Sequence, residues 1–343
     1  MFQLVDHSRG ARRWVGAKDD WLATIDKHCN LELVNPYTGR GINLPPLTTI
    51  PEVLIEEGRI VFECGAYSFR RVVMCETPPS DTSADNGCIA VAMVNVLLLA
   101  ITRAGDKSWT PLIMPRERDL YCDVECTDVL LHKRKVFAVS WSGDIYTWDM
   151  GSQPDPIRPP HIIQYACRWN LAESADGRRL LLVAFPYNHR QVMHLVFTSM
   201  HVISRRVHGT RDIVVTGQWV HGAVLLYERD VDDIVTGGAD GAGWNLVTSL
   251  GDHSLFLGAN FPFLARIVND QDDRELLRPN CIYHTEGQLP ESILDLDQDY
   301  CFHVYDLEDK VYKPYTGFYA NHKGSYQTPI WFRPTLKNFL RPS

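Results

Sequence analysis

The chain has 343 residues, of which 45% are hydrophobic and 22% charged, and this composition is typical of a globular protein with a sizeable core. The formal net charge of −8 gives no overall attraction for phosphate backbones or anionic lipid, so nucleic acid is not expected as a partner. The longest apolar run, residues 88–101, is interrupted by Asn95 and is shorter than the roughly 20 residues of a membrane helix, so no membrane partner is expected.

The nine cysteines are scattered and lack the dense spacing of a disulfide scaffold. We therefore expect reduced, mostly buried thiols. The N-terminal sequence MFQLVDHSRGARRW has no apolar stretch long enough for a signal peptide. A cytoplasmic or nuclear location, or both, is the expectation.

In chain order, residues 1–20 are expected to form a solvated tail, and short β-branched and aromatic runs then recur between Gly, Asp, Asn and Pro. Extended helical patterns of apolar residues are scarce. The pattern predicts an all-β chain, with strands at 21–25, 31–34, 59–62, 129–131, 136–139, 180–185, 213–215 and 223–227.

Two turns have the chemistry of tight hairpins. Ser142, Gly143 and Asp144 separate VFAVSW from IYTW, and Asp176 with Gly177 precedes RRLLLVAF. Glycine supplies positive φ and Asp tolerates it, so these turns predict antiparallel hairpins. Segments rich in Pro, Gly, Ser and Asp are expected to be exposed loops, at 76–87, 151–160 and 231–243.

A loose repeat links these strands: a strand, a Gly or Asp turn, and a segment bearing Trp, Tyr or Pro. The first three copies are spaced by roughly 40 to 70 residues, which predicts a β-propeller of four-stranded antiparallel blades, six or seven in number. The propeller domain is expected at 21–336, followed by a tail at 337–343. A pair of β-sandwiches is the alternative fold.

Six segments, taken in order, resemble a plant family of F-box-associated β-propellers of the KIB type. They are NPYTGRGINLPPL, DVLLHKRKVFAVSWSGDIYTWD, LAESADGRRLLLVAF, SLGDHSLFLGAN, PNCIYHTEG and WFRPTL. The resemblance implies a structural signature made of Asn35, Pro36, Gly39, Pro45, Pro46, Trp148, Asp149, Gly251, Asp252, Gly258, Asn280, Cys281, Tyr283, Trp331 and Pro334.

This resemblance implies a non-enzymatic protein-interaction propeller, similar to the substrate-recognition domain of plant F-box proteins in ubiquitin ligase pathways. Its partner would be a protein whose identity the sequence leaves open. The family's F-box, a helical module of roughly 40 residues that docks the Skp adaptor, does not fit before residue 21. Direct binding of that adaptor is therefore not expected.

The alternative function is a propeller-type hydrolase or lactonase, with a metal or carboxylates in its central channel. Cys122, Cys126 and His132 lack the fourth ligand of a structural zinc site. No nucleophile elbow or nucleotide-binding loop occurs. We therefore expect no catalytic residue, no metal and no cofactor. The aromatic residues beside the turns, among them Trp148 and Trp244, could line a binding pocket, but such residues more often pack between blades, so no binding residue is assigned.

Overall fold

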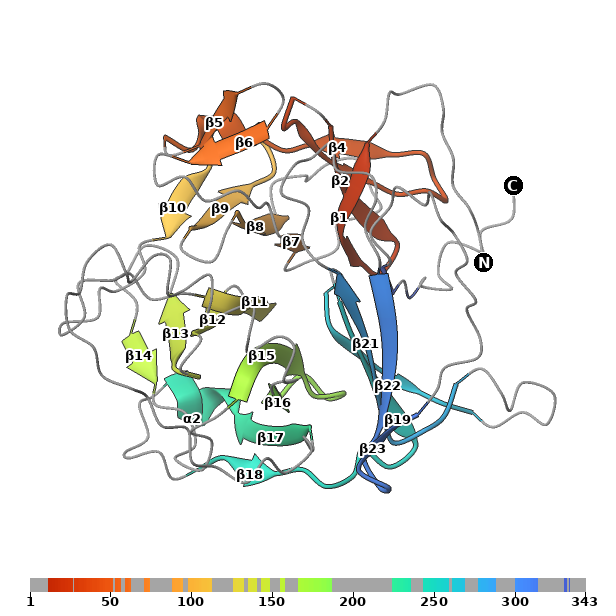
Figure 1. The fold of residues 1–343 in the computed structure, drawn as a ribbon. Helices are drawn as coiled ribbons and strands as arrows, with labels where there is room; N and C mark the ends of the chain where they lie inside the picture. Colours follow the sequence, from red (N-terminus) through yellow and green to blue (C-terminus); the bar gives the residue numbers. More distant parts are fainter. Residues whose placement is uncertain are drawn as a thin grey trace, which may run out of the picture.

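The computed structural model describes residues 12–26, 28–51, 53–56, 59–62, 71–74, 88–94, 98–112, 126–132, 135–140, 143–148, 155–157, 166–186, 224–235, 243–258, 261–268, 277–287, 300–313, 330–331 and 333. Their strands form five sheets of four or five strands and one separate two-stranded hairpin. The five sheets surround a common centre as the blades of a propeller (Figure 1). This arrangement excludes a pair of β-sandwiches.

Blades 1 to 4 are four-stranded antiparallel sheets, as the turn chemistry predicts. Blade 1 consists of β1 (Arg13–Lys18), β2 (Trp21–Ile25), β3 (Leu31–Val34) and β4 (Gly41–Asn43). Blade 2 consists of β7 (Arg71–Met74), β8 (Ile89–Met93), β9 (Leu99–Arg103) and β10 (Thr110–Leu112).

Blade 3 consists of β11 (Cys126–His132), β12 (Lys135–Ser140), β13 (Ile145–Trp148) and β14 (Asp155–Ile157). Blade 4 consists of β15 (Ala166–Glu173), β16 (Arg179–Pro186), β17 (Leu225–Asp230) and β18 (Asn245–Leu246). The β12–β13 and β15–β16 turns contain Gly143 and Gly177 at φ of +88° and +64°. The two predicted hairpins are therefore confirmed.

Blade 5 departs from the four-stranded pattern. It has five strands in the order β20–β19–β21–β22–β23, and β19 runs parallel to β21. These strands are β19 (His253–Leu257), β20 (Phe263–Arg266), β21 (Cys281–Gly287), β22 (Tyr300–Asp306) and β23 (Val311–Lys313). Because β20 returns along the inner side of β19, the chain must cross to the other side of β19 before it forms β21.

The inner strands β1, β7, β11, β15 and β20 contact one another in sequence around the centre. The ring is closed between blades 5 and 1, where the backbone N–H of Phe261 donates to the carbonyl of Ala17 at 2.6 Å. We call this junction the closing seam. Buried apolar clusters join blade 1 to blade 2, blades 2 to 4 to one another, and blade 4 to blade 5, so these neighbouring blades share hydrophobic core.

The prediction of six or seven blades is wrong for the described part of the chain, which forms five. The sequence between blades is longer than the predicted repeat, because the hairpin of β5 (Val53–Glu56) and β6 (Arg59–Phe62) lies between blades 1 and 2. In addition, β16 pairs directly with β17 although residues 187–224 lie between them in sequence. Length alone therefore overestimates the number of blades.

The expected tail at 1–20 contains β1, the inner strand of blade 1, and that boundary is corrected. The charged residues at the two ends of β1 are typical of a solvent-exposed segment. Between them, however, Val15 and Ala17 are buried. A Cβ at Gly16 would lie 2.1 Å from the carbonyl oxygen of Val72, so glycine permits the close approach of β1 to β7.

Two expected loops contain regular structure. Strand β14 lies within 151–160, where Pro156 is tolerated because β14 is the outer edge strand of its sheet. The short helix α2 (Val231–Val235) opens the segment 231–243 and buries Val231 and Ile234. The segments 76–87, 213–215 and 337–343 lie outside the described residues.

Within the described ranges, no helix is both long and apolar enough to span a membrane.

A candidate binding pocket at the closing seam

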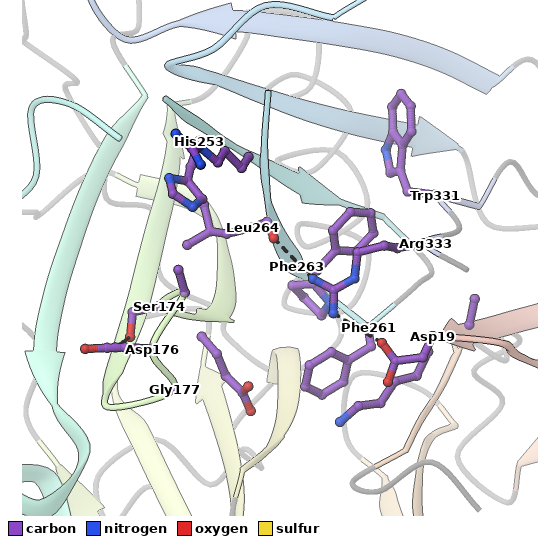
Figure 2. A pocket seen from close by; sticks show the side chains of 16 residues that line it. Asp19, Ser174, Asp176, Gly177, His253, Phe261, Phe263, Leu264, Trp331 and Arg333 are labelled. Atoms are coloured by element: carbon purple, nitrogen blue, oxygen red, sulfur yellow. Dashed lines mark hydrogen bonds and ion pairs between the residues drawn. The ribbon is translucent and has the colours of Figure 1, made fainter. Parts of the chain in front are cut away.

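A cavity of about 490 Å³ lies at the closing seam (Figure 2). Its walls come from the end of β1, the β15–β16 turn, the start of β19, the segment from Phe261 to Arg266, and Trp331 with Arg333. Blades 1, 4 and 5 therefore each contribute one wall, although their residues are far apart in sequence. A concave site with aromatic walls and a few polar or charged groups is the usual form of a binding pocket.

Aromatic side chains form the blade 5 wall. The rings of Phe256 and Phe263 stack with centroids 5.0 Å apart, and Phe256 also stacks on Tyr283 at 4.9 Å. Trp331 contacts Phe256 edge to face at 5.2 Å, which fixes this half-buried indole beside the cavity. Of these rings, Phe263 and Trp331 line the cavity, and their contacts with Phe256 hold them in place.

Two cationic side chains from neighbouring segments lie over aromatic rings of this wall. The Lys18 ammonium lies 3.8 Å from the centre of the Phe261 ring, and the Arg333 guanidinium lies 5.2 Å from the centre of Phe263. Arg333 also pairs with Asp19 at 3.2 Å and donates to the carbonyl of Leu264 at 3.3 Å. Arg333 thus connects the C-terminal segment, blade 5 and blade 1.

Opposite the aromatic wall, the β15–β16 turn presents carboxylates. Asp176 accepts hydrogen bonds from the Ser174 hydroxyl at 2.6 Å and the Arg178 backbone N–H at 3.0 Å. These bonds, the Ser174 bond above all, hold the pKa of Asp176 below its ordinary value, so the carboxylate is ionised at neutral pH. Glu173 lies 2.9 Å from Nδ1 of the buried His132.

A charged cluster of Arg266, Asp252 and His253 lies at the blade 5 end of the cavity. Nε of Arg266 donates to Asp252 at 2.6 Å, and His253 Nδ1 contacts the other oxygen of Asp252 at 2.7 Å. The hydrogen bond from Arg266 is the main reason why the pKa of Asp252 lies below its ordinary value. Arg266 keeps 71% of its side chain exposed, so its remaining N–H groups face solvent at the rim.

Behind the pocket, a buried ionic network joins the inner strands. Arg71 of blade 2 forms an ion pair with Asp128 of blade 3 and donates to the carbonyls of Val129 and Gly258, at 2.8 and 2.9 Å. Asp128 also accepts the side-chain amide of Asn170, on blade 4, at 3.0 Å. Four blades therefore meet at one charged pair near the centre of the ring.

The first signature segment forms the β3–β4 turn and the exit from blade 1. Asn35 is buried, and its side-chain oxygen accepts the backbone N–H groups of Tyr37 and Thr38, with Pro36 between and Gly39 at φ of +69°. The Pro45 carbonyl accepts the indole N–H of Trp109 at 2.6 Å, and Pro46 precedes the short 3₁₀ helix Leu47–Thr49. These signature residues shape the fold and lie away from the pocket.

The C-terminal signature segments converge in blade 5. The Asn280 side chain accepts the Leu250 backbone N–H at 2.8 Å, which joins the turn containing Gly251 and Asp252 to the start of β21. The Tyr283 hydroxyl accepts the Arg278 backbone N–H at 2.6 Å. Three further signature residues lie in or near blade 5. Cys281 is buried, the carbonyl of Gly258 accepts a hydrogen bond from Arg71, and Trp331 lines the pocket.

Trp148 is buried in blade 3, whereas Asp149 and Pro334 lie outside the described residues. Cys126 and His132, considered as metal ligands, lie at opposite ends of β11, and Cys122 is outside the described ranges. Among the residues that the structure describes, no group of three or more His, Cys, Asp or Glu is placed to hold a metal ion.

Sequence reasoning missed most of the pocket. Of the signature, only Trp331 lines the cavity and Asp252 touches its rim, whereas Glu173, Phe261, Phe263 and Arg333 were not singled out. The alternation in FPFLAR is a weak signal for an inner strand. Nothing in the sequence indicates that this strand meets the β15–β16 turn and the end of β1.

Comparison with known proteins gives one family model and a number of solved structures. The family model described as KIB1-4 beta-propeller matches residues 2–313. A search of curated proteins finds no match. Solved structures that match include YCF48 bound to D1 peptide, with 13% identity, TM-score 0.34, and 73% of this chain and 57% of that chain covered.

Two further structures illustrate the range of these matches. The WD40 domain of SCAP from fission yeast has 9% identity and a TM-score of 0.31, with 88% of this chain and 64% of that chain covered. An ancestral GH74 enzyme has 10% identity and a TM-score of 0.35, with 86% and 30% covered. The chain thus spans less than two thirds of the length of each of these three structures. Because the family model extends over residues 2–313, the chain belongs to the KIB1-4 β-propeller family.

Proposed function

We propose that this chain is a non-enzymatic protein-interaction propeller and that a segment of its protein partner binds in the seam pocket. The observation that carries the proposal is the combination of fixed aromatic rings with partly exposed arginines around one cavity. Aromatic residues and Arg supply most of the binding energy at protein interfaces, because they bury a large area and still offer polar contacts.

The family resemblance supports a more specific role. We propose that the propeller selects a protein in a ubiquitin ligase pathway, as the substrate-recognition domains of plant F-box proteins do. A cytoplasmic or nuclear location is part of this proposal. It is supported by four buried cysteines that form no disulfide, Cys29, Cys88, Cys126 and Cys281.

The environment of the central carboxylate supports a binding role over a hydrolytic one. Asp128 is 1% exposed and is engaged by Arg71, Asn170 and the backbone of Leu171. A carboxylate held in this way stabilises the ring and does not face a substrate. We therefore propose a module that works without a metal, a cofactor or a catalytic group.

The proposal is tested by blocking the pocket without touching the core. Ala175 lies in the exposed β15–β16 turn and lines the cavity, so Ala175→Trp fills the space with an indole. Lys107→Trp places the same side chain in the exposed β9–β10 turn, outside the cavity, and is the matched control. Both variants and the wild-type chain are used for affinity capture, after circular dichroism has verified their folding.

We expect at least one protein that both the wild-type chain and Lys107→Trp recover and that Ala175→Trp recovers at least tenfold less. That protein is the candidate partner of the pocket. If all reproducible partners bind the two tryptophan variants equally, the pocket is not the binding site and the proposal is wrong.

A further inference from the structure

The charges on the two sides of the seam pocket are not equally neutralised. On the aromatic side, Arg333 is paired with Asp19 and Arg266 with Asp252. On the blade 4 side, Glu173 contacts His132, and Asp176 is bound by a hydroxyl and a backbone N–H. Within the described part of the chain, Glu173 forms no ion pair with Lys or Arg, whereas the charges of Arg178 and Arg179 help to lower the pKa of Asp176.

The balance of charge therefore favours a cationic ligand. After the two ion pairs are set aside, Lys18 is the cation that lines the cavity, and Glu173 and Asp176 are the carboxylates that line it. The Lys18 ammonium already lies against the Phe261 ring. Because Arg178 and Arg179 offset part of the charge of Asp176, Glu173 is the carboxylate of this wall that no described Lys or Arg pairs, on a chain whose formal net charge is −8.

We infer that the seam pocket binds a lysine or arginine side chain from a basic segment of the partner, with Glu173 as its ion-pair partner. This inference rests on the proposed function and names the chemistry of its ligand. In this binding mode, the aliphatic stem of the side chain packs against Trp331, and its charged head faces the wall formed by the end of β15, since Trp331 and Glu173 line the same cavity. The exposed Asp176 adds attraction at the entrance.

The position of Glu173 makes it the stronger of the two carboxylates. Glu173 is the last residue of β15, an inner strand, and 26% of its side chain is exposed. Its contact with the buried His132 ring holds the carboxylate in one orientation, so little side-chain entropy is lost on binding. An ion pair formed in this partly enclosed site is screened less by salt than one at the open surface.

The ligand class is tested with short synthetic probes. The first is an acetylated, amidated pentapeptide with Arg at its centre and Gly and Ser elsewhere. In the second, citrulline replaces Arg, which preserves shape and removes the charge, and in the third Glu replaces Arg. Ligand-observed NMR titration gives the dissociation constant of each probe for the full chain and for Glu173→Gln. Glu308→Gln changes an exposed carboxylate in the β22–β23 turn and is the control.

We expect the Arg probe to bind the wild-type chain and Glu308→Gln at least tenfold more tightly than the citrulline probe does. Glu173→Gln should lose most of this preference while it keeps the wild-type melting temperature. Equal binding of the Arg and citrulline probes, an unchanged preference in Glu173→Gln, or tighter binding of the Glu probe would each overturn the inference.

These outcomes are separable from failure of the proposed function. A protein partner that Ala175→Trp loses but Glu173→Gln retains at full strength supports a binding pocket and refutes the basic ligand. The absence of any pocket-dependent partner refutes the proposed function itself.

Discussion

Gly143 shows how strongly a single residue of this fold is constrained. It occupies the β12–β13 turn at φ of +88°, and a Cβ there would lie 2.7 Å from the Trp169 ring. Positive φ disfavours any residue with a side chain, and the buried indole leaves no room for one. Position 143, where blades 3 and 4 meet, therefore requires glycine for two independent reasons, the positive φ and the contact with the Trp169 ring.

We predict that Gly143→Ala destabilises the protein by about 2–4 kcal/mol, because it combines backbone strain with displacement of Trp169. Gly105 is the matched control: its φ is +93°, and a Cβ there would have no neighbour within 4 Å. Gly105→Ala should cost about 1 kcal/mol, from the backbone alone. Urea unfolding of both variants measures the difference, and equal losses would contradict the role of Trp169.

Local chemistry made some residues predictable and left others hidden. Gly143 and Gly177 follow from turn rules that depend on a few adjacent residues. Glu173 stands beside one of these turns, yet its importance arises from His132 on another blade and from aromatic rings on a third. Such a site exists only after the ring has closed, so no local pattern encodes it.

At the scale of the element, blades 1 and 2 are joined by the segment that follows β4. The Trp109 indole donates to the Pro45 carbonyl at 2.6 Å, and the Trp109 backbone N–H donates to the Thr49 hydroxyl at 3.1 Å. The rigid Pro45–Pro46 pair holds these acceptors in place. The LPPL segment is therefore a connector between blades.

We predict that Trp109→Phe is more destabilising than Trp148→Phe by about 1 kcal/mol. Both indoles are 3% exposed, but the Trp148 N–H has no hydrogen-bond partner among the described residues. The two changes thus remove similar packing, and only Trp109→Phe leaves a buried carbonyl without its donor. Thermal and urea unfolding test this, and an equal loss for the two variants would show that the Pro45 bond adds nothing.

Strands were predictable where a short run rich in apolar residues is bounded by turn residues, as in β2, β3 and β6, whose predicted bounds are those observed. Strand β1 was missed because charged residues flank its short buried centre. The parallel pairing of β19 and β21 was also missed. Periodicity reports which face of a strand is buried but not which strand lies beside it, so the order of blade 5 was beyond local rules.

At the scale of the whole molecule, the Arg71–Asp128 pair holds the ring together from its centre. Both side chains are at least 93% buried, and their partners lie on blades 3, 4 and 5. Removal of one member leaves the other charge buried without its counterpart. The blade count, by contrast, depends on long connections that sequence length cannot assign to particular blades.

We predict strong coupling between the two residues in a double-mutant cycle. Arg71→Met and Asp128→Asn should each cost about 3–5 kcal/mol, and the double variant should cost at least 1.5 kcal/mol less than their sum. The same cycle on the exposed pair of Arg179 and Glu228 should give less than about 1 kcal/mol. Coupling as small as that of the surface pair would mean that the central pair does not unite the blades.

The central claim is that a protein partner binds at the closing seam, and hydrogen–deuterium exchange of the chain with and without its captured partner tests it most directly. The account predicts that binding slows exchange in the β15–β16 turn, at the end of β1 and in β20, the segments that line the pocket. Protection confined to the outer strands β4, β10, β14, β18 or β23, with the seam unchanged, would contradict it.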